Sequence, residues 1–306
     1  MKVVDLSWRL PGPLATFFLA RQGIDVVKFE DAHHRDPFLK WSWDPSFVEI
    51  YNAFQGPKDL RLVDFSNPGD VATIHEEIRA SDAVVMSFPR RVEEKLGLTT
   101  EGIEHDFTGV AFIRLGFRPG DDHSAHDLNS LAQSGLLKMH VLDRLDPIIA
   151  PPFLPVTGMF YSYHIAITVL AAVAEQRREA PPIQRWSYLE EAVDEARDAY
   201  YPASIRGRAP ATFLHNGRFP CYNLYRTLDG GYLAVAAVEP KFWARFRELA
   251  GLTDLSDDDG LSDGLRGERV KQAILASIGS RTSVEWRAIF AGEDVCVDLV
   301  DPYDMG

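Results

Sequence analysis

The sequence predicts an α/β protein: a Rossmann-like, doubly wound parallel sheet with a second, smaller α+β domain. In the first half, short apolar runs alternate with helical segments, and glycine or proline marks most junctions between them. In the second half, a hairpin signal is followed by amphipathic helical patterns. We expect residues 1–185 to form the large domain with its following helices, and residues 186–306 a helical linker and the small domain.

Five apolar runs predict the strands of the large domain. They cover residues 3–6, 24–29, 60–65, 83–86 and 110–115. After the first run, Gly12-Pro13 opens a helix that ends at Gly23, because proline suits the first helical turn and glycine the position after the last. Repeated strand–helix–strand units of this kind favour a mostly parallel sheet.

Helices are expected to dominate the next stretch, over residues 127–134, 159–176 and 186–199. The second of these segments is the most apolar part of the chain, but Ser162 and Thr168 interrupt it. A transmembrane helix needs about 18 or more consecutive apolar residues. We therefore expect a buried helix here, and no membrane partner.

The small domain is predicted from turn and capping signals. Residues 222–227 and 232–237 flank the turn-forming residues 228–231, which indicates a β-hairpin. Residues 282–285 read Thr-Ser-Val-Glu, a capping box that starts a helix. Residues 295–300 form a final apolar strand pattern.

Charge and cysteine content exclude several classes of protein. The net charge is −13, from 32 basic and 45 acidic residues, which argues against a nucleic-acid partner or an anionic membrane surface. Cys221 and Cys296 form neither a metal-binding spacing nor a disulfide framework, so a reducing, cytoplasmic location is expected. The adjacent His33 and His34 lie in a charged, proline-bounded segment, which favours a solvated loop over a metal site.

A histidine beside an expected helix start is the main chemical feature. His126 precedes Asp127, the expected N-cap, and the helix runs to Gly135. Imidazole titrates near neutrality, and a helix N-terminus carries partial positive charge and free N–H groups that suit a developing oxyanion. The pattern indicates proton transfer beside a carbonyl. From spacing alone, an ordinary cap with an inactive neighbouring histidine is the alternative.

Several blocks in order along the chain resemble the family III CoA-transferases, which include the alpha-methylacyl-CoA racemases. The blocks are residues 3–30, 81–98, the His126-Asp127 pair and residues 219–243. The last two resemble the racemase branch in particular. The resemblance implies an acyl-CoA substrate, no permanently bound cofactor beyond coenzyme A as part of that substrate, and a homodimer of two interlocked chains. It also implies a returning C-terminal segment, whereas this sequence is short and stops at Gly306.

The resemblance assigns catalytic roles residue by residue. His126 corresponds to the racemase general base, and Glu239 to the glutamate that pairs with it. The backbone N–H groups of Asp127 and its neighbours would stabilise the oxyanion. The Asp127 side chain would cap the helix rather than act as a nucleophile. Thr157 stands where the family has an aspartate, the nucleophile of the transferases and second acid/base of the racemases. Threonine forms no acyl anhydride and is a poor acid. The site therefore has one competent side: an acid/base residue, His126, faces only one side of the substrate.

The resemblance also places a coenzyme A nucleotide site. Its expected lining residues are Phe88, Arg90, Arg91, Lys95 and Lys58. The cations would hold phosphate groups through charge-assisted hydrogen bonds, with fewer basic residues than the family usually has.

Three functions stay open from the sequence. The first is α-proton abstraction from an acyl-CoA, giving racemisation, epimerisation or a related isomerisation, with His126 as base. The second is coenzyme A transfer between carboxylic acids, for which Glu239 is the only family-aligned carboxylate in the site. The third is a catalytically impaired or repurposed member that binds a thioester or another ligand.

Overall fold

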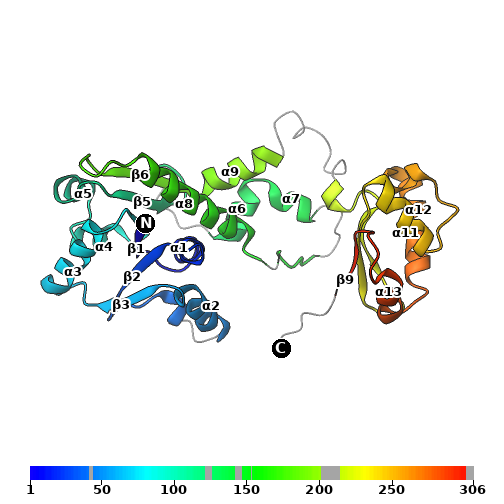
Figure 1. Ribbon diagram of the computed structural model, residues 1–306, viewed down its shortest axis with the longest axis horizontal. Coiled ribbons are helices and arrows are strands. Elements are labelled where there is room, and N and C mark those ends of the chain that lie inside the picture. The colour runs from blue at the N-terminus through cyan, green and yellow to red at the C-terminus, as the bar shows by residue number, and fades with distance from the viewer. Residues whose placement is uncertain (41–43, 121–125, 142–146, 153, 201–213, 301–306) are drawn as a thin grey trace. The chain divides into compact units, whose positions relative to one another are not determined.

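The chain forms two compact units, Met1–Ser204 and Ile205–Gly306. The structure is a computed structural model that describes residues 1–40, 44–120, 126–141, 147–152, 154–200 and 214–300 (Figure 1). Each unit has its own sheet and its own hydrophobic core. The predicted α/β fold with a smaller second domain is confirmed.

The first unit is built on a six-stranded sheet with strand order β3-β2-β1-β4-β5-β6. The strands are β1 Lys2–Leu6, β2 Asp25–Asp31, β3 Asp59–Val63, β4 Ala83–Met86, β5 Ala111–Gly116 and β6 Ile183–Tyr188. Every neighbouring pair in this sheet is parallel. The strand order reverses direction between β1 and β4, so the carboxyl ends of these two strands mark the topological switch point, where doubly wound proteins bind ligands.

Helices cover both faces of this sheet, because successive side chains of a strand point to opposite faces. Val3 packs in a core with α1, α8 and α9, whereas Val4 packs in a second core with α3, α4 and α5. The helices are α1 Gly12–Arg21, α2 Ser46–Gln55, α3 Pro68–Arg79, α4 Arg90–Lys95, α5 Thr100–Asp106, α6 Asp127–Gln133, α7 Leu136–Val141, α8 Val156–Glu175 and α9 Leu189–Tyr200, with a short η1 at Pro37–Leu39.

The helix α8 is both a core element and an exposed one. Tyr161, Ile165 and Val169 lie in the core beneath it. Among the described residues α8 is also long and apolar enough to cross a membrane by length and composition, with a mean hydropathy of 1.5 and 39% of that window buried. The expected buried helix is therefore present, but only one of its sides is covered.

Residues 183–200 differ from the prediction. A helix was expected over 186–199, whereas residues 183–188 form the edge strand β6 and α9 begins only at Leu189. The rings of Trp186 and Tyr188 stack on one side of this strand, with centroids 5.6 Å apart, which is the two-residue period of a strand. Pairing with β5 ties these residues to the first unit, so the expected division between 185 and 186 falls inside β6.

The second unit is an antiparallel sheet covered by helices. Its strands, in the order β7-β8-β9, are β7 Tyr222–Arg226, β8 Tyr232–Ala236 and β9 Val297–Val300. Its helices are α11 Pro240–Leu249, α12 Gly264–Ile278 and α13 Ser283–Phe290, with short turns η3 Leu214–Asn216 and η4 Asp257–Leu261. The predicted hairpin pairs β7 with β8. The predicted capping box is also present, since Glu285 accepts a hydrogen bond from the Thr282 N–H at 2.7 Å.

Candidate active site

His126 occupies the N-cap of α6 and is exposed. Its backbone N–H donates to the Asn129 side chain at 3.1 Å, and its carbonyl accepts from the Ser130 N–H at 3.1 Å. The sequence placed the cap one residue later, at Asp127. The cap falls on His126 because the Asn129 amide oxygen closes the first turn on the His126 backbone, which leaves the Asp127 side chain available for another partner.

That partner is the start of α8. The Asp127 Oδ1 atom accepts a hydrogen bond from the Thr157 hydroxyl at 2.6 Å and another from the Gly158 N–H at 2.8 Å. The residue before α8 is Pro155, which supplies no side-chain cap. Asp127 therefore caps α8 from a different helix. The structure brings together three predicted catalytic residues, His126, Asp127 and Thr157, of which Thr157 is fully buried.

Glu239 lies at the N-cap of α11, directly before Pro240, and is exposed. The described residues give its carboxylate neither a hydrogen bond nor an ion pair. It can therefore accept an imidazole N–H. His126 belongs to the first unit and Glu239 to the second, so their pairing stays a prediction.

Two aromatic rings lie in contact at the switch point of the sheet. Trp8 follows β1 and Phe88 follows β4, and their ring centroids are 4.8 Å apart. The Trp8 backbone N–H donates to the Ser87 hydroxyl at 2.9 Å, which joins the two strand ends. Phe88, one of the expected nucleotide-site residues, is thus a buried member of this aromatic pair, at 5% exposure.

Three of the expected phosphate-binding cations lie on α4, the helix that follows β4. Arg90 and Arg91 start this helix and Lys95 ends it, and all three are exposed. Arg90 pairs with Glu94 at 3.0 Å, and the Lys95 ammonium donates to the Ser66 hydroxyl at 2.6 Å. Their charges are accessible to an anionic group arriving from solvent.

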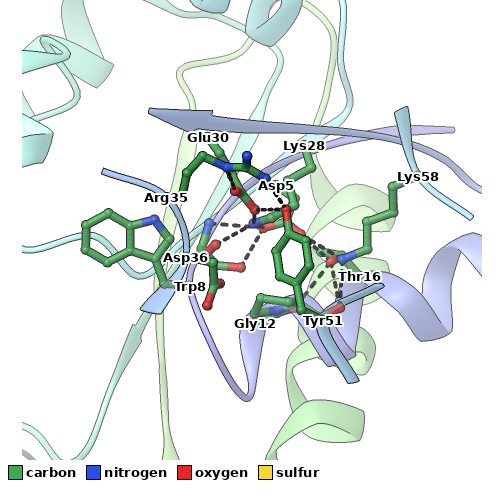
Figure 2. A network of polar contacts seen from close by, with 12 residues as sticks. Asp5, Trp8, Gly12, Thr16, Lys28, Glu30, Arg35, Asp36, Tyr51 and Lys58 are labelled. Carbon is green, nitrogen blue, oxygen red and sulfur yellow. Dashed lines mark hydrogen bonds and ion pairs between the residues drawn. The ribbon is translucent and has the colours of Figure 1, made fainter. Parts of the chain in front are cut away.

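The fourth cation, Lys58, has a different role from the predicted one. Its side chain is fully buried, and its ammonium donates to Asp5 at 3.1 Å and to the Pro13 carbonyl at 2.8 Å (Figure 2). Lys58 lies just before β3 and turns inward, where the buried Asp5 carboxylate needs a positive partner. It is therefore not available to a phosphate, which corrects the expectation from the sequence.

Asp5 is the centre of this buried network. Lys28 lies on its other side at 3.5 Å, and the hydroxyls of Ser7 and Thr16 donate to it. Burial by itself raises the pKa of Asp5, but the two ammonium groups and the hydroxyls outweigh that effect and hold the pKa well below its usual range. Burial lowers the pKa of Lys58 to about 8, although Asp5 partly opposes this shift.

The network extends to the loop that follows β1. Glu30 accepts from Arg35 at 2.8 Å and from the Tyr51 hydroxyl at 2.9 Å. Asp36 accepts from the backbone N–H of Arg9 at 2.8 Å, where Arg9 has a left-handed φ of 55°. Lys28, Arg35 and Lys58 thus form ion pairs with Asp5 and Glu30, whereas the Asp36 carboxylate is held by backbone N–H groups (Figure 2).

This network fixes residues 7–12, the loop at the switch point. Lys28 donates to the Ser7 carbonyl at 2.5 Å. A side chain at Gly12 would place its Cβ 2.4 Å from the Ser7 hydroxyl, so the close approach of this turn requires glycine. Sequence reasoning missed the network. Its signal was present, since charged residues inside apolar strands, such as Asp5 and Lys28, are buried only when they are paired.

Metal binding finds no support in the described ranges. No group of three histidine, cysteine or acidic side chains there lies close enough to hold an ion. His33 and His34 are exposed and lie beside two different carboxylates, Asp64 at 3.5 Å and Asp31 at 3.3 Å.

Comparisons with known proteins decide the family. The model of CoA-transferase family III matches residues 1–305. The chain belongs to this family. Human alpha-methylacyl-CoA racemase is 26% identical over 313 residues, which cover 98% of this chain and 76% of the racemase. The succinate–glutarate CoA-transferase of Agrobacterium fabrum is 30% identical over 280 residues, 85% of this chain and 68% of that protein.

A solved structure gives the same fold. A CAIB/BAIF family protein from Brucella suis aligns over 99% of this chain and 83% of its own, with a TM-score of 0.74 at 18% identity. The resemblance predicted from the sequence blocks is thus confirmed at the level of family and fold. Racemases and CoA-transferases both occur among the relatives, so the reaction of this family III member is inferred from its own residues.

Proposed function

We propose that this protein removes the α-proton of an acyl-CoA thioester, with His126 as the base. The main observation behind this proposal is the position of His126. It is exposed at the start of α6, and the next residue, Asp127, caps α8. Two observations support this choice: the sequence around His126-Asp127 resembles the racemase branch, and the whole chain is similar to human alpha-methylacyl-CoA racemase.

The reaction makes an enolate, and each residue has a defined part in it. The imidazole takes the proton, and the first backbone N–H groups of α6, which have no partner within the helix, face developing charge on the thioester oxygen. The Glu239 carboxylate would accept the other imidazole N–H, fixing its tautomer and raising its basicity. The product is an epimer or an isomer, according to how the proton returns.

The opposite face of the substrate lacks an equivalent acid. Thr157 stands there, fully buried, and its hydroxyl proton is committed to the Asp127 carboxylate at 2.6 Å. Proton return from that face is therefore slow, and solvent or His126 itself returns most protons. We propose a proton-transfer site with one competent side.

Coenzyme A would bind as part of the substrate at the switch point. Phe88 supplies an apolar floor there, and Arg90, Arg91 and Lys95 offer accessible charge for phosphate groups. Lys58 is left out of this site because its ammonium is buried on Asp5.

We further propose that two copies of this chain form a homodimer through α8. Phe160, Tyr163, Ile167 and Leu170 are between 42% and 65% exposed, and their spacing puts them on one side of the helix. No charged residue precedes Glu175 in α8. In a chain with a net charge of −13, two copies meet with least repulsion through an uncharged face. Sedimentation should show a wild-type dimer and an Ile167→Glu monomer; a monomeric wild type would contradict the pairing.

Deuterium exchange tests the proton-transfer proposal. A 2-methylacyl-CoA incubated with the protein in heavy water should gain deuterium at its α-carbon, as followed by mass spectrometry. His126→Ala should abolish this exchange. His105→Ala is the matched control, since His105 is 86% exposed at the end of α5 and pairs only locally with Asp106. Exchange that survives His126→Ala would overturn the proposal.

Transfer of coenzyme A between carboxylic acids is the second candidate. It is favoured by the open Glu239 carboxylate and by the similarity to a CoA-transferase. Glu239 would then form the acyl-enzyme anhydride, because Thr157 has no carboxylate with which to form one. Transfer between two acids, with a hydroxylamine-trapped intermediate lost in Glu239→Gln, would select this function. Failure to bind any CoA ester by calorimetry would exclude both reactions and leave a non-catalytic role.

A further inference from the structure

The junction of α6 and α8 is tied by one buried hydroxyl. Thr157 has no exposed surface, and its hydroxyl donates to the Asp127 carboxylate at 2.6 Å and lies 3.2 Å from the Asp127 carbonyl oxygen. The Gly158 N–H donates to the same carboxylate oxygen at 2.8 Å. Asp127 is therefore bound to α8 by two hydrogen bonds to its carboxylate, one from Thr157 and one from Gly158.

This tie fixes the residue next to Asp127. The backbone of His126 is held on its own side by Asn129 and Ser130, at 3.1 Å each. On the other side it is held through Asp127. Because α6 has only seven residues, it is marginal as an isolated helix and depends on such outside contacts.

The anchor itself belongs to the rigid part of the first unit. The helix α8 has 20 residues and sends Tyr161 and Ile165 into the core of the sheet. Ser162 also donates to the Pro11 carbonyl at 3.1 Å, which joins α8 to the loop after β1. A residue that is hydrogen-bonded to the start of α8 is thus held in a fixed position relative to the core.

We propose that Thr157 is a positioning residue for His126, acting through Asp127. The inference rests on the proposed function for what His126 does, but the placement of His126 can be measured separately. It changes the meaning of the threonine, which is the hydrogen-bond donor that the Asp127 carboxylate requires rather than a weakened acid.

Substitutions in α8 test this role. Thr157→Val keeps the shape and removes the hydroxyl, whereas Thr157→Ser keeps the hydroxyl. The matched control is Thr168→Val, because Thr168 lies on the same helix and donates only to the His164 carbonyl at 2.8 Å. Circular dichroism and thermal melting establish that each variant is folded.

The first readout needs no activity. Amide hydrogen exchange of residues 127–130 and the imidazole NMR signals of His126 report the placement directly. We expect exchange about tenfold faster and a shifted imidazole signal in Thr157→Val, since the loss of one hydrogen bond to a charged group is worth about that factor. Thr157→Ser and Thr168→Val should match the wild type. Unchanged exchange and imidazole signals in Thr157→Val would overturn the proposal.

The second readout is α-proton exchange of a 2-methylacyl-CoA. We expect Thr157→Val to lower kcat by about a hundredfold with little change in KM, because displacing a base by about 1 Å costs that much. Thr157→Ser should restore the rate. Thr157→Asp, which supplies the family's carboxylate but no donor for Asp127, should also lower the rate; a gain in substrate inversion would instead show that Thr157 is only a lost acid. If His126 moves but no acyl-CoA exchanges in any variant, the positioning role stands and the proposed function fails.

Discussion

Two regions of the first unit use charged and polar residues in opposite ways. In the network around Asp5, every charged side chain has a partner, and Asp5, Lys28 and Lys58 have no exposed side-chain surface. At the start of α6, His126 is exposed, and the Asn129 side chain holds its backbone N–H. The buried, paired residues hold the loop at the switch point, whereas the exposed His126 side chain is accessible to a substrate. Both regions lie in sequence blocks that resemble the same family.

The largest effect that the comparison predicts on folding is the loss of Asp5. Asp5→Asn leaves the buried Lys58 ammonium without a carboxylate and the buried Lys28 ammonium with Glu30 alone, so the free energy of unfolding should fall by about 3–5 kcal/mol. Urea denaturation measures it. The control is Asp59→Asn, because Asp59 is 52% exposed and its pair with Arg61 is worth at most about 1 kcal/mol. A loss as small as the control's would contradict the structural role of the network.

Glu239→Gln probes the opposite kind of residue. Its carboxylate is exposed and has no bond among the described residues, so unfolding should change by less than about 0.5 kcal/mol. If Glu239 orients the His126 imidazole as proposed, the rate of α-proton exchange should fall by about ten- to a hundredfold. Paired melting curves and exchange rates check both halves. A large loss of stability with normal exchange would reverse the assignment.

Lys58 should make the free energy of unfolding depend on pH. Its pKa in the folded protein is about 8, below the ordinary value of 10.5. Between these values the unfolded lysine holds a proton that the folded one lacks, so stability rises with pH, by up to about 1.4 kcal/mol for each pH unit. Denaturation from pH 7.5 to 9.5 should show this extra rise in the wild type but not in Lys58→Met. Parallel curves for the two proteins would contradict it.

The smallest expected effect concerns the open cations of α4. Arg90→Ala with Lys95→Ala should weaken binding of coenzyme A about tenfold and reduce its salt dependence, because charge-assisted bonds to phosphate are lost. Lys58→Met should leave both unchanged, once it is shown to be folded. Calorimetry at two salt concentrations provides the measurement. Weaker binding in Lys58→Met alone would restore the phosphate role that the structure removes.

The sequence predicted the elements whose patterns are local. Apolar runs located the first five strands, and Thr282 with Glu285 marked a helix start that the structure confirms. The edge strand β6 was missed because Gln184 and Arg185 break its apolar pattern, and only pairing with β5 makes it a strand. A local pattern cannot show such long-range pairing.

The sequence named three neighbouring residues of the candidate site but not the contacts between them. His126, Asp127 and Thr157 do lie together, yet Asp127 caps α8 instead of its own helix. Lys58 was predicted to bind a phosphate because the sequence shows the charge of a residue but not whether it is buried. Both differences depend on contacts between segments at least thirty residues apart.

The central claim is a proton-transfer site with one competent side. The direct measurement is to incubate one enantiomer of a 2-methylacyl-CoA with the protein in heavy water, following deuterium uptake and inversion in the same sample. We predict deuterium uptake that outpaces inversion, because His126 works on one face and Thr157 offers no acid on the other. No uptake, or inversion as fast as uptake, would contradict this account.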